Sequence, residues 1–317
     1  MHARRHAALK LRARLYAAIR DFFAKRGVVE VETPILSEAG NTEPNIESFR
    51  ALGAITGEAG RWLRTSPEFP LKRLLAEGFG DCYELGRVFR DGESGRRHNP
   101  EFTMLEWYRL GITHHQLADE VAELVQTALA LTGRTLRIEK TGYRDLYSRQ
   151  FGIDPFTASI ETLRQPLDGL SIRADGLTRD DWLDLLMTHR LQPAFAPDAL
   201  VFVSDFPPSQ CALAKIAGQG GDAVAQRFEA YLAGQELANG YHELADAAEQ
   251  RARFRNDNAR RRTRGQMDVP IDERLLAALE RGLPDCAGVA LGIERLLMAM
   301  AGAERIGDVL AYAFDEA

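Results

Sequence analysis

The residues best suited to chemistry lie in three short segments of this 317-residue sequence. The first segment, residues 87–102, combines several arginines and a histidine with Phe102, between two predicted strands. Arginine presents a planar fork of donors that matches phosphate oxygens. The segment is therefore a candidate polyphosphate-binding loop, although an exposed charged hairpin has the same composition.

The second segment reads Gly-Val-Ala-Leu-Gly-Ile-Glu-Arg-Leu over residues 288–296. Glycine in a strand lets a ligand or another backbone approach closely. Arg295 then falls in the first turn of the helix that follows, and the positive end of a helix favours phosphate. The alternative is a tightly packed buried strand.

The third segment places two carboxylates, Glu236 and Glu243, around Asn239-Gly240. We interpret Asn-Gly as a turn, and oxygen ligands of this kind suit Mg²⁺. By itself the pattern is weak, because acids often flank Asn-Gly turns.

The apolar spacing predicts the elements that position these segments. A helix is expected over residues 5–26, followed by a strand over 28–32 that ends at Pro34. Further expected helices cover 115–132, 222–233, 246–264, 271–282 and 294–301, and expected strands cover 61–69, 81–89, 101–109, 201–204 and 287–292. For part of 222–233, an extended conformation is the alternative. Residues 137–200 are predicted to be a helical insertion.

The composition is that of an ordinary globular protein, with 45% hydrophobic and 27% charged residues. No signal peptide or membrane-spanning run is present, which predicts a cytoplasmic protein without membrane contact. The net charge of −6 leaves only local basic clusters, at residues 4–14 and 260–264, as candidate docking surfaces. The three cysteines match no disulfide or zinc spacing.

Taken in order, the segments resemble the class II aminoacyl-tRNA synthetases. The helix, strand and Pro34 resemble their first motif, residues 89–102 the second, and Gly292-Ile-Glu-Arg295 the third. The runs 65–68 and 98–108 are similar to the lysine branch. The resemblance implies an α+β fold, a mostly antiparallel sheet flanked by helices, in a homodimer. It also implies one catalytic domain over 1–317, with the insertion at about 137–200.

Lysyl-tRNA synthetases also carry an anticodon-binding barrel of about 100 residues. The first-motif helix begins too close to Met1 to leave room for it. The chain thus resembles more closely the bacterial ligases that attach lysine or (R)-β-lysine to a lysine side chain of elongation factor P. This resemblance implies ATP as a substrate, Mg²⁺ as a cofactor, an aminoacyl-adenylate intermediate, and a protein acceptor rather than tRNA. Two alternatives stay open: a tRNA-charging core without an anticodon domain, and a non-catalytic paralogue.

The resemblance also assigns roles to residues. Arg90 and Arg295 would be catalytic and would bind phosphate. Other residues implied in ATP binding are Asp91, Gly92, Asn99, Phe102, Glu236, Leu237 and Gly292. Residues implied in binding the amino acid are Ser66, Pro67, Glu68, Tyr108, Glu243 and Ala290. Mg²⁺ would be held by Glu236 and Glu243.

Two positions depart from the family pattern. Gly92 stands where the second motif usually has Glu, and Glu93 follows it. Ala290 stands where the tRNA-charging lysine enzymes have Gly. One added methyl group would shorten the amino-acid pocket, and we expect it to favour β-lysine over α-lysine.

Overall fold

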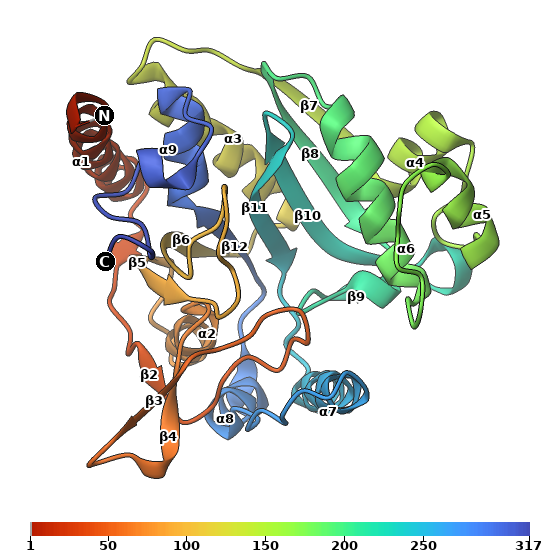
Figure 1. Ribbon diagram of the computed structural model, residues 1–317. Coiled ribbons are helices and arrows are strands. Elements are labelled where there is room, and N and C mark those ends of the chain that lie inside the picture. The colour runs from red at the N-terminus through yellow and green to blue at the C-terminus, as the bar shows by residue number, and fades with distance from the viewer. Residues whose placement is uncertain (1) are drawn as a thin grey trace. The chain divides into compact units, whose positions relative to one another are not determined.

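The computed structural model describes residues 2–317, with side chains from Arg4 onward, and divides into two compact units (Figure 1). The first unit comprises the chain up to Ile112, residues 127–134 and Ala245–Ala317. The second comprises residues 113–126 and 135–244. Each unit is described in turn.

The sheet of the first unit is mostly antiparallel. Its order is β1-β5-β6-β12, where the strands are β1 (Val29–Glu30), β5 (Cys82–Phe89), β6 (Glu101–Leu110) and β12 (Cys286–Gly292). Only β1 and β5 are parallel within this order. The long hairpin β5–β6 and the strand β12 confirm the sequence prediction. A smaller antiparallel sheet contains β2 (Leu36–Ser37), β4 (Gly57–Leu63) and β3 (Arg50–Gly53).

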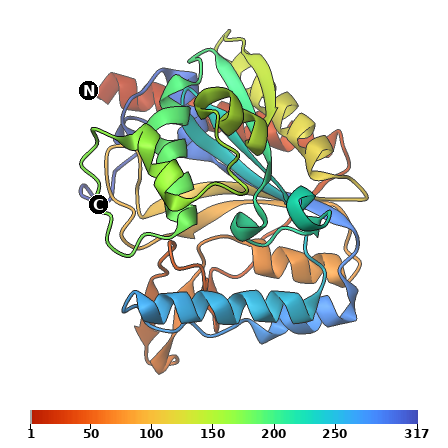
Figure 2. The ribbon, with the colours of Figure 1, turned by 90° about the vertical axis from the view of Figure 1, so that its right-hand side faces the viewer.

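Five helices of the first unit position its strands: α1 (His2–Ala24), α2 (Glu68–Ala76), α7 (Ala247–Thr263), α8 (Glu273–Gly282) and α9 (Ile293–Ala301). The apolar face of α1 is buried against the sheet, where Phe23 stacks on Tyr83 at 4.3 Å and meets Trp107 edge-on. Helices α7 and α8 lie side by side (Figure 2).

A buried carboxylate, Glu294, joins all three predicted motifs. It accepts a hydrogen bond from the Thr103 amide of β6 at 2.9 Å and forms an ion pair with Arg12 of α1 at 2.8 Å. Since Glu294 lies in the first turn of α9, these bonds fix the start of the helix that carries Arg295.

The second unit contains a second group of strands in the order β11-β10-β8-β7. Their bounds are β7 (Arg137–Gly142), β8 (Ala199–Phe206), β10 (Val224–Leu232) and β11 (Gln235–His242), and the short β9 (Ile216–Ala217) pairs with β10. The pair β7–β8 is parallel and the others are antiparallel. Its helices are most of α3 (His114–Ala130), α4 (Tyr143–Phe151), α5 (Ile160–Arg164) and α6 (Arg179–Leu186).

Helices α4 to α6 pack on β8 through one apolar cluster. Within it, the Tyr143 hydroxyl donates to Tyr147 at 2.8 Å, and Tyr147 donates to the carbonyl of Leu183 at 2.7 Å. Both phenols are buried, and these bonds satisfy them. The helical character expected for residues 137–200 is thus present, but strand β7 opens the segment.

The structure corrects two further predictions. Residues 222–233, expected to be helical, form β10, which pairs with β8 and β11. Consecutive residues at its end are buried, so apolar residues lie on both faces of the strand and mimic helical spacing. Asn239-Gly240 lies inside β11 rather than in a turn. The turn between β10 and β11 is at Ala233-Gly234, where both residues have positive φ.

Candidate functional site

The second-motif loop folds as an arginine–aromatic platform. The Arg90 amide donates to the carbonyl of Pro100 at 2.8 Å, which closes the base of the hairpin. The Arg90 guanidinium lies 5.2 Å from the centre of the Phe102 ring, and its Nη1 is 3.5 Å from Glu93 Oε1. This geometry holds a cationic fork beside a flat apolar ring. A nucleotide, with an anionic chain and an aromatic base, suits such a pair.

The neighbouring loop residues follow this arrangement. The Asp91 amide donates to the carbonyl of Glu47 at 2.9 Å, and Gly92 has a φ of +78°, a conformation that glycine adopts readily. Glutamate, the usual residue at position 92, would be strained there. The structure therefore explains why the acidic residue stands at 93, within reach of Arg90.

The third motif reaches the same hairpin. Gly292 caps α9, and Arg295 Nη2 donates to His98 Nε2 at 3.0 Å. The structure thus brings Arg90, Phe102 and Arg295 to one loop, although they are distant in sequence. Asn99 lies in the same loop. Its side-chain Nδ2 donates to the carbonyl of Glu101, and its Oδ1 accepts from the amide of Phe314, so Asn99 holds the C-terminal segment against the loop.

A second set of predicted residues surrounds a carboxylate that the sequence analysis missed, Glu106. The Ser66 hydroxyl donates to Glu106 Oε2 at 2.6 Å, and the Tyr108 hydroxyl donates to Glu106 Oε1 at 2.8 Å. Glu106 is 2% exposed. Ala290 of β12 is its direct partner in the strand register, on the same face of the sheet. A buried carboxylate held by two hydroxyls is a strong acceptor for an ammonium group.

Glu68 is already paired within this set. Its carboxylate contacts the buried Lys72 Nζ at 2.5 Å, one helical turn away on α2. The Ser66 hydroxyl also accepts from the Glu68 amide at 2.9 Å, and Pro67 caps α2. Lys72 therefore compensates the charge of Glu68.

In the second unit, Glu236 belongs to a polar face that β10 and β11 share. The register pairs Glu229 with Asn239 and Tyr231 with Glu236. Arg227 donates to Asn239 Oδ1 at 3.1 Å and forms an ion pair with Glu229. Burial raises the pKa of Glu229, and the charge of Glu236 raises it further, while Arg227 opposes both effects.

The Glu229 carboxylate also accepts from the Tyr231 hydroxyl, so Arg227 and Tyr231 both bind it. Leu237, the next residue of β11 after Glu236, is buried. Sequence analysis missed Glu229 because it assigned its segment to a helix, which would have placed it away from Glu236.

Glu243 is buried but lies just beyond the end of β11. The assignment of Mg²⁺ to Glu236 and Glu243 therefore stays a prediction, and Glu229 is a further carboxylate on the strand paired with that of Glu236.

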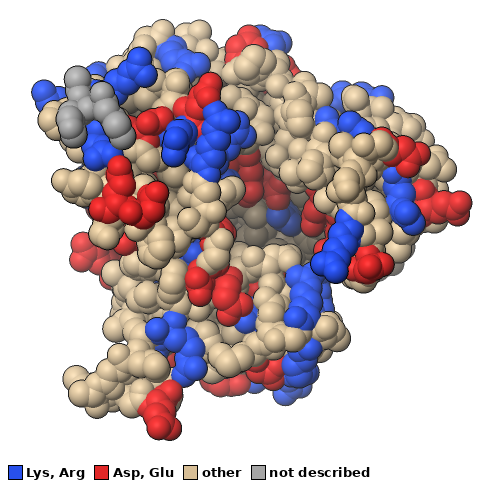
Figure 3. Space-filling view, viewed as in Figure 1, with Lys and Arg blue, Asp and Glu red and all other residues tan. Residues whose placement is uncertain are grey.

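The basic clusters prove to be partly structural. Arg261 is 1% exposed, and its Nη2 donates to both carboxylate oxygens of Glu47, at 2.8 and 3.0 Å. Arg12 is likewise engaged with Glu294. Neither is available to a partner, which corrects our expectation for these positions. On the face seen in Figure 3, blue and red atoms are interspersed, so that face carries no continuous patch of one sign.

We expect Arg261→Ala to destabilise the protein by about 3 kcal/mol, because it leaves the Glu47 carboxylate and backbone acceptors around it without their donor. Arg260→Ala, one residue earlier and exposed, should change stability by less than about 0.5 kcal/mol. Urea unfolding of both variants measures the difference. Equal stability of the two variants would contradict the structural role of Arg261.

The sequence as a whole matches the family model of tRNA synthetases class II (D, K and N) over residues 1–316. The chain belongs to this family. Its α+β fold is therefore the class II synthetase fold. The first motif corresponds to helix α1 and the strand that follows it, the second to the hairpin β5–β6, and the third to the start of helix α9.

Several curated relatives of this synthetase-family chain share most of its length. Elongation factor P--(R)-beta-lysine ligase of Vibrio cholerae is 47% identical over 316 residues, covering 98% of this chain and 96% of the relative. The ligase of the same name from Klebsiella pneumoniae (strain 342) is 45% identical, covering 96% and 94%. That of Edwardsiella ictaluri is 44% identical, covering 98% and 96%. Across residues 2–317, none of the helices combines the length and hydropathy needed to cross a bilayer.

Proposed function

We propose that this protein activates (R)-β-lysine, or lysine, with ATP and transfers it to a lysine side chain of elongation factor P. The observation that carries the proposal is the buried Glu106 carboxylate, which accepts from Ser66 and Tyr108 and would suit a substrate ammonium. The high identity to ligases of that name over nearly the whole chain supports the same acceptor.

Activation begins when a carboxylate oxygen of the amino acid attacks the α-phosphorus of ATP. The bond from that phosphorus to the bridging oxygen breaks, and pyrophosphate leaves. The residues of this chain position the groups and stabilise charge. Arg90 would donate to the α-phosphate, Phe102 would stack on the adenine, and Arg295 would bind the base or a terminal phosphate.

Transfer completes the reaction. The neutral amine of the acceptor lysine attacks the carbonyl carbon of the adenylate, AMP leaves, and an amide forms with loss of a proton. Glu68, Glu106 and Glu243 would hold the substrate's ammonium groups, with Pro67 and Ala290 shaping the pocket. A substrate without those groups would leave buried charges unpaired, which is a strong basis for selection.

Glu236 and Glu243 would hold Mg²⁺, as the family resemblance implies, and Glu229 on the adjacent strand could assist Glu236. Bound there, the ion would neutralise charge on the phosphates. Asp91, Gly92, Asn99, Leu237 and Gly292 would complete the ATP site. We propose that the protein is a homodimer, because its first motif resembles the element that forms the dimer interface in the family. We also propose that it is cytoplasmic, because its proposed acceptor is a translation factor.

We expect Ala290→Gly to change donor preference. The mutation removes a methyl group beside Glu106 and lengthens the pocket, so kcat/KM for α-lysine relative to (R)-β-lysine should rise about tenfold. Amino-acid-dependent pyrophosphate exchange with each donor measures the ratio. An unchanged ratio would contradict a role for Ala290 in selection, whatever the absolute rates.

The activation step is tested by pyrophosphate exchange with purified protein, ATP, Mg²⁺ and one donor at a time. We expect exchange with (R)-β-lysine and lysine, and none with leucine, which lacks the side-chain ammonium. Absence of exchange with every donor would contradict the proposal and favour a non-catalytic paralogue.

A further inference from the structure

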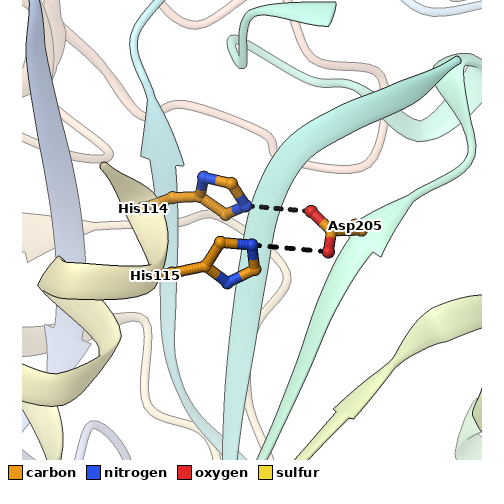
Figure 4. A group of neighbouring side chains, drawn as sticks. All are labelled: His114, His115 and Asp205. Atoms are coloured by element: carbon orange, nitrogen blue, oxygen red, sulfur yellow. Dashed lines mark hydrogen bonds and ion pairs between the residues drawn. The ribbon is translucent and has the colours of Figure 1, made fainter. Parts of the chain in front are cut away.

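Two histidines and an aspartate meet in the second unit, apart from every residue given a role above. His114 and His115 open helix α3, and Asp205 lies near the end of β8. Both rings point at the Asp205 carboxylate (Figure 4). The Nε2 atom of His114 is 3.0 Å from Asp205 Oδ1, and the Nε2 atom of His115 is 3.5 Å from Oδ2.

The separations suit a common metal ion. The three side chains offer ligand atoms that all lie within 4.8 Å of one another. Bonds of about 2.0–2.1 Å around a tetrahedral ion place neighbouring ligand atoms about 3.3 Å apart. The two observed histidine–carboxylate separations bracket that value. Closing the ligand set on an ion therefore needs only small rotations of the side chains.

The cluster is anchored on one side and open on the other. The His114 side chain is 3% exposed, whereas those of Asp205 and His115 are 34% and 55% exposed. An ion can therefore enter from solvent, and water can fill a fourth position. Asp205 also has a φ of +62°, which is uncommon for a residue other than glycine and occurs often at functional positions.

The donor set selects the kind of metal. Two imidazoles and one carboxylate suit Zn²⁺ and similar borderline divalent ions, whereas Mg²⁺ and Ca²⁺ prefer oxygen ligands throughout.

We propose that His114, His115 and Asp205 form a binding site for Zn²⁺ or a similar transition-metal ion, with three protein ligands and one water. The ion would join the start of α3 to the end of β8, segments that are 91 residues apart in sequence. The proposal is independent of the proposed ligase activity, because none of its residues takes part in that reaction.

The affinity of this site for Zn²⁺ should be moderate. When Nε2 of His114 binds the ion, its proton must reside on Nδ1, a buried atom without a hydrogen-bond partner in the described part of the chain. Metal-binding histidines usually donate this second N–H to a carboxylate or a carbonyl. We therefore expect a Kd in the micromolar range rather than the nanomolar range.

The test is titration of the full-length, metal-stripped protein with Zn²⁺, in excess Mg²⁺ to occupy oxygen-only sites, and with Co²⁺ as a spectroscopic probe. We expect one Zn²⁺ per chain and the visible absorption of four-coordinate Co²⁺. His115→Ala and Asp205→Asn should each weaken Zn²⁺ binding at least tenfold. Asparagine tolerates the left-handed backbone at position 205, so this variant should keep the fold.

The matched control is His189→Ala, which removes an exposed histidine of the same unit outside the cluster. It should leave Zn²⁺ affinity and the Co²⁺ spectrum unchanged. Absence of stoichiometric Zn²⁺ binding would overturn the proposal. Binding that survives both cluster variants, or that His189→Ala weakens equally, would overturn it as well, because the ion would then reside elsewhere.

Discussion

Glu106→Gln should lower kcat/KM for lysine-dependent pyrophosphate exchange by about 10²- to 10³-fold. Truncating the charge of a buried, hydrogen-bonded ion pair costs about 2–5 kcal/mol. The substitution keeps the size of the side chain and an oxygen that can accept from Ser66 or Tyr108. The loss should therefore come from the missing negative charge, and most of it should appear as a higher KM for the amino acid with KM for ATP nearly unchanged.

The control for this variant is Glu101→Gln, an exposed glutamate at the other end of β6. It should exchange pyrophosphate at the wild-type rate. If Glu106→Gln bound lysine as well as the wild type, the pocket would not depend on that carboxylate. The assignment of Glu106 to ammonium binding would then be wrong, even if the reaction were the one proposed.

Arg90→Ala should lower the rate constant for adenylate formation by about 10³-fold. Removing one donor aimed at developing charge in a preorganised site typically costs about 10²- to 10³-fold, and Arg90 also supports the Phe102 ring, so we expect the upper end. Arg90→Lys should fall in between, because lysine keeps the charge but lacks the planar fork. Single-turnover formation of the adenylate measures the effect directly.

Arg96→Ala tests whether this loss is specific. Arg96 lies in the same loop but is exposed, with an ion pair to the exposed Glu304. Its removal should change adenylate formation by less than about threefold. Comparable losses in the two variants would indicate a general charge effect of the loop and would contradict a specific role for Arg90.

Local sequence signals predicted the elements of the first unit well. Helix α1 has a regular apolar stripe ended by Gly27, and the β5–β6 hairpin combines two alternating strands with a polar loop. These predicted elements also placed Arg90, Phe102 and Arg295 correctly along the chain, since each residue lies at the end of a predicted strand or at the start of a predicted helix. Their meeting at one loop depends on the register of β6 with β12 and was expected only through the family resemblance.

Long-range pairing explains what the sequence alone did not predict. The β10 segment has helical spacing because both of its faces are covered, and no local signal reveals that. Misreading β10 concealed Glu229, and Asn239-Gly240 was taken for a turn because the true turn, at Ala233-Gly234, has a less typical sequence. The burial of Arg261 depends on Glu47, which is more than 200 residues away.

Glu106 could have been found from the sequence. It stands two residues before Tyr108 in a predicted strand, and side chains two residues apart lie on the same face of a strand. An acidic residue at a buried position of a strand, beside a residue already implicated in substrate binding, is a signal of function rather than of folding.

The central claim is that the activated amino acid goes to a protein, and intact-mass measurement of the acceptor tests it most directly. Elongation factor P would be incubated with the enzyme, ATP, Mg²⁺ and (R)-β-lysine, and tRNA would be offered in a parallel reaction. We predict a mass increase of one β-lysyl group on elongation factor P, dependent on ATP and absent with Arg90→Ala, and no charging of tRNA. Charged tRNA together with an unmodified elongation factor P would contradict the account.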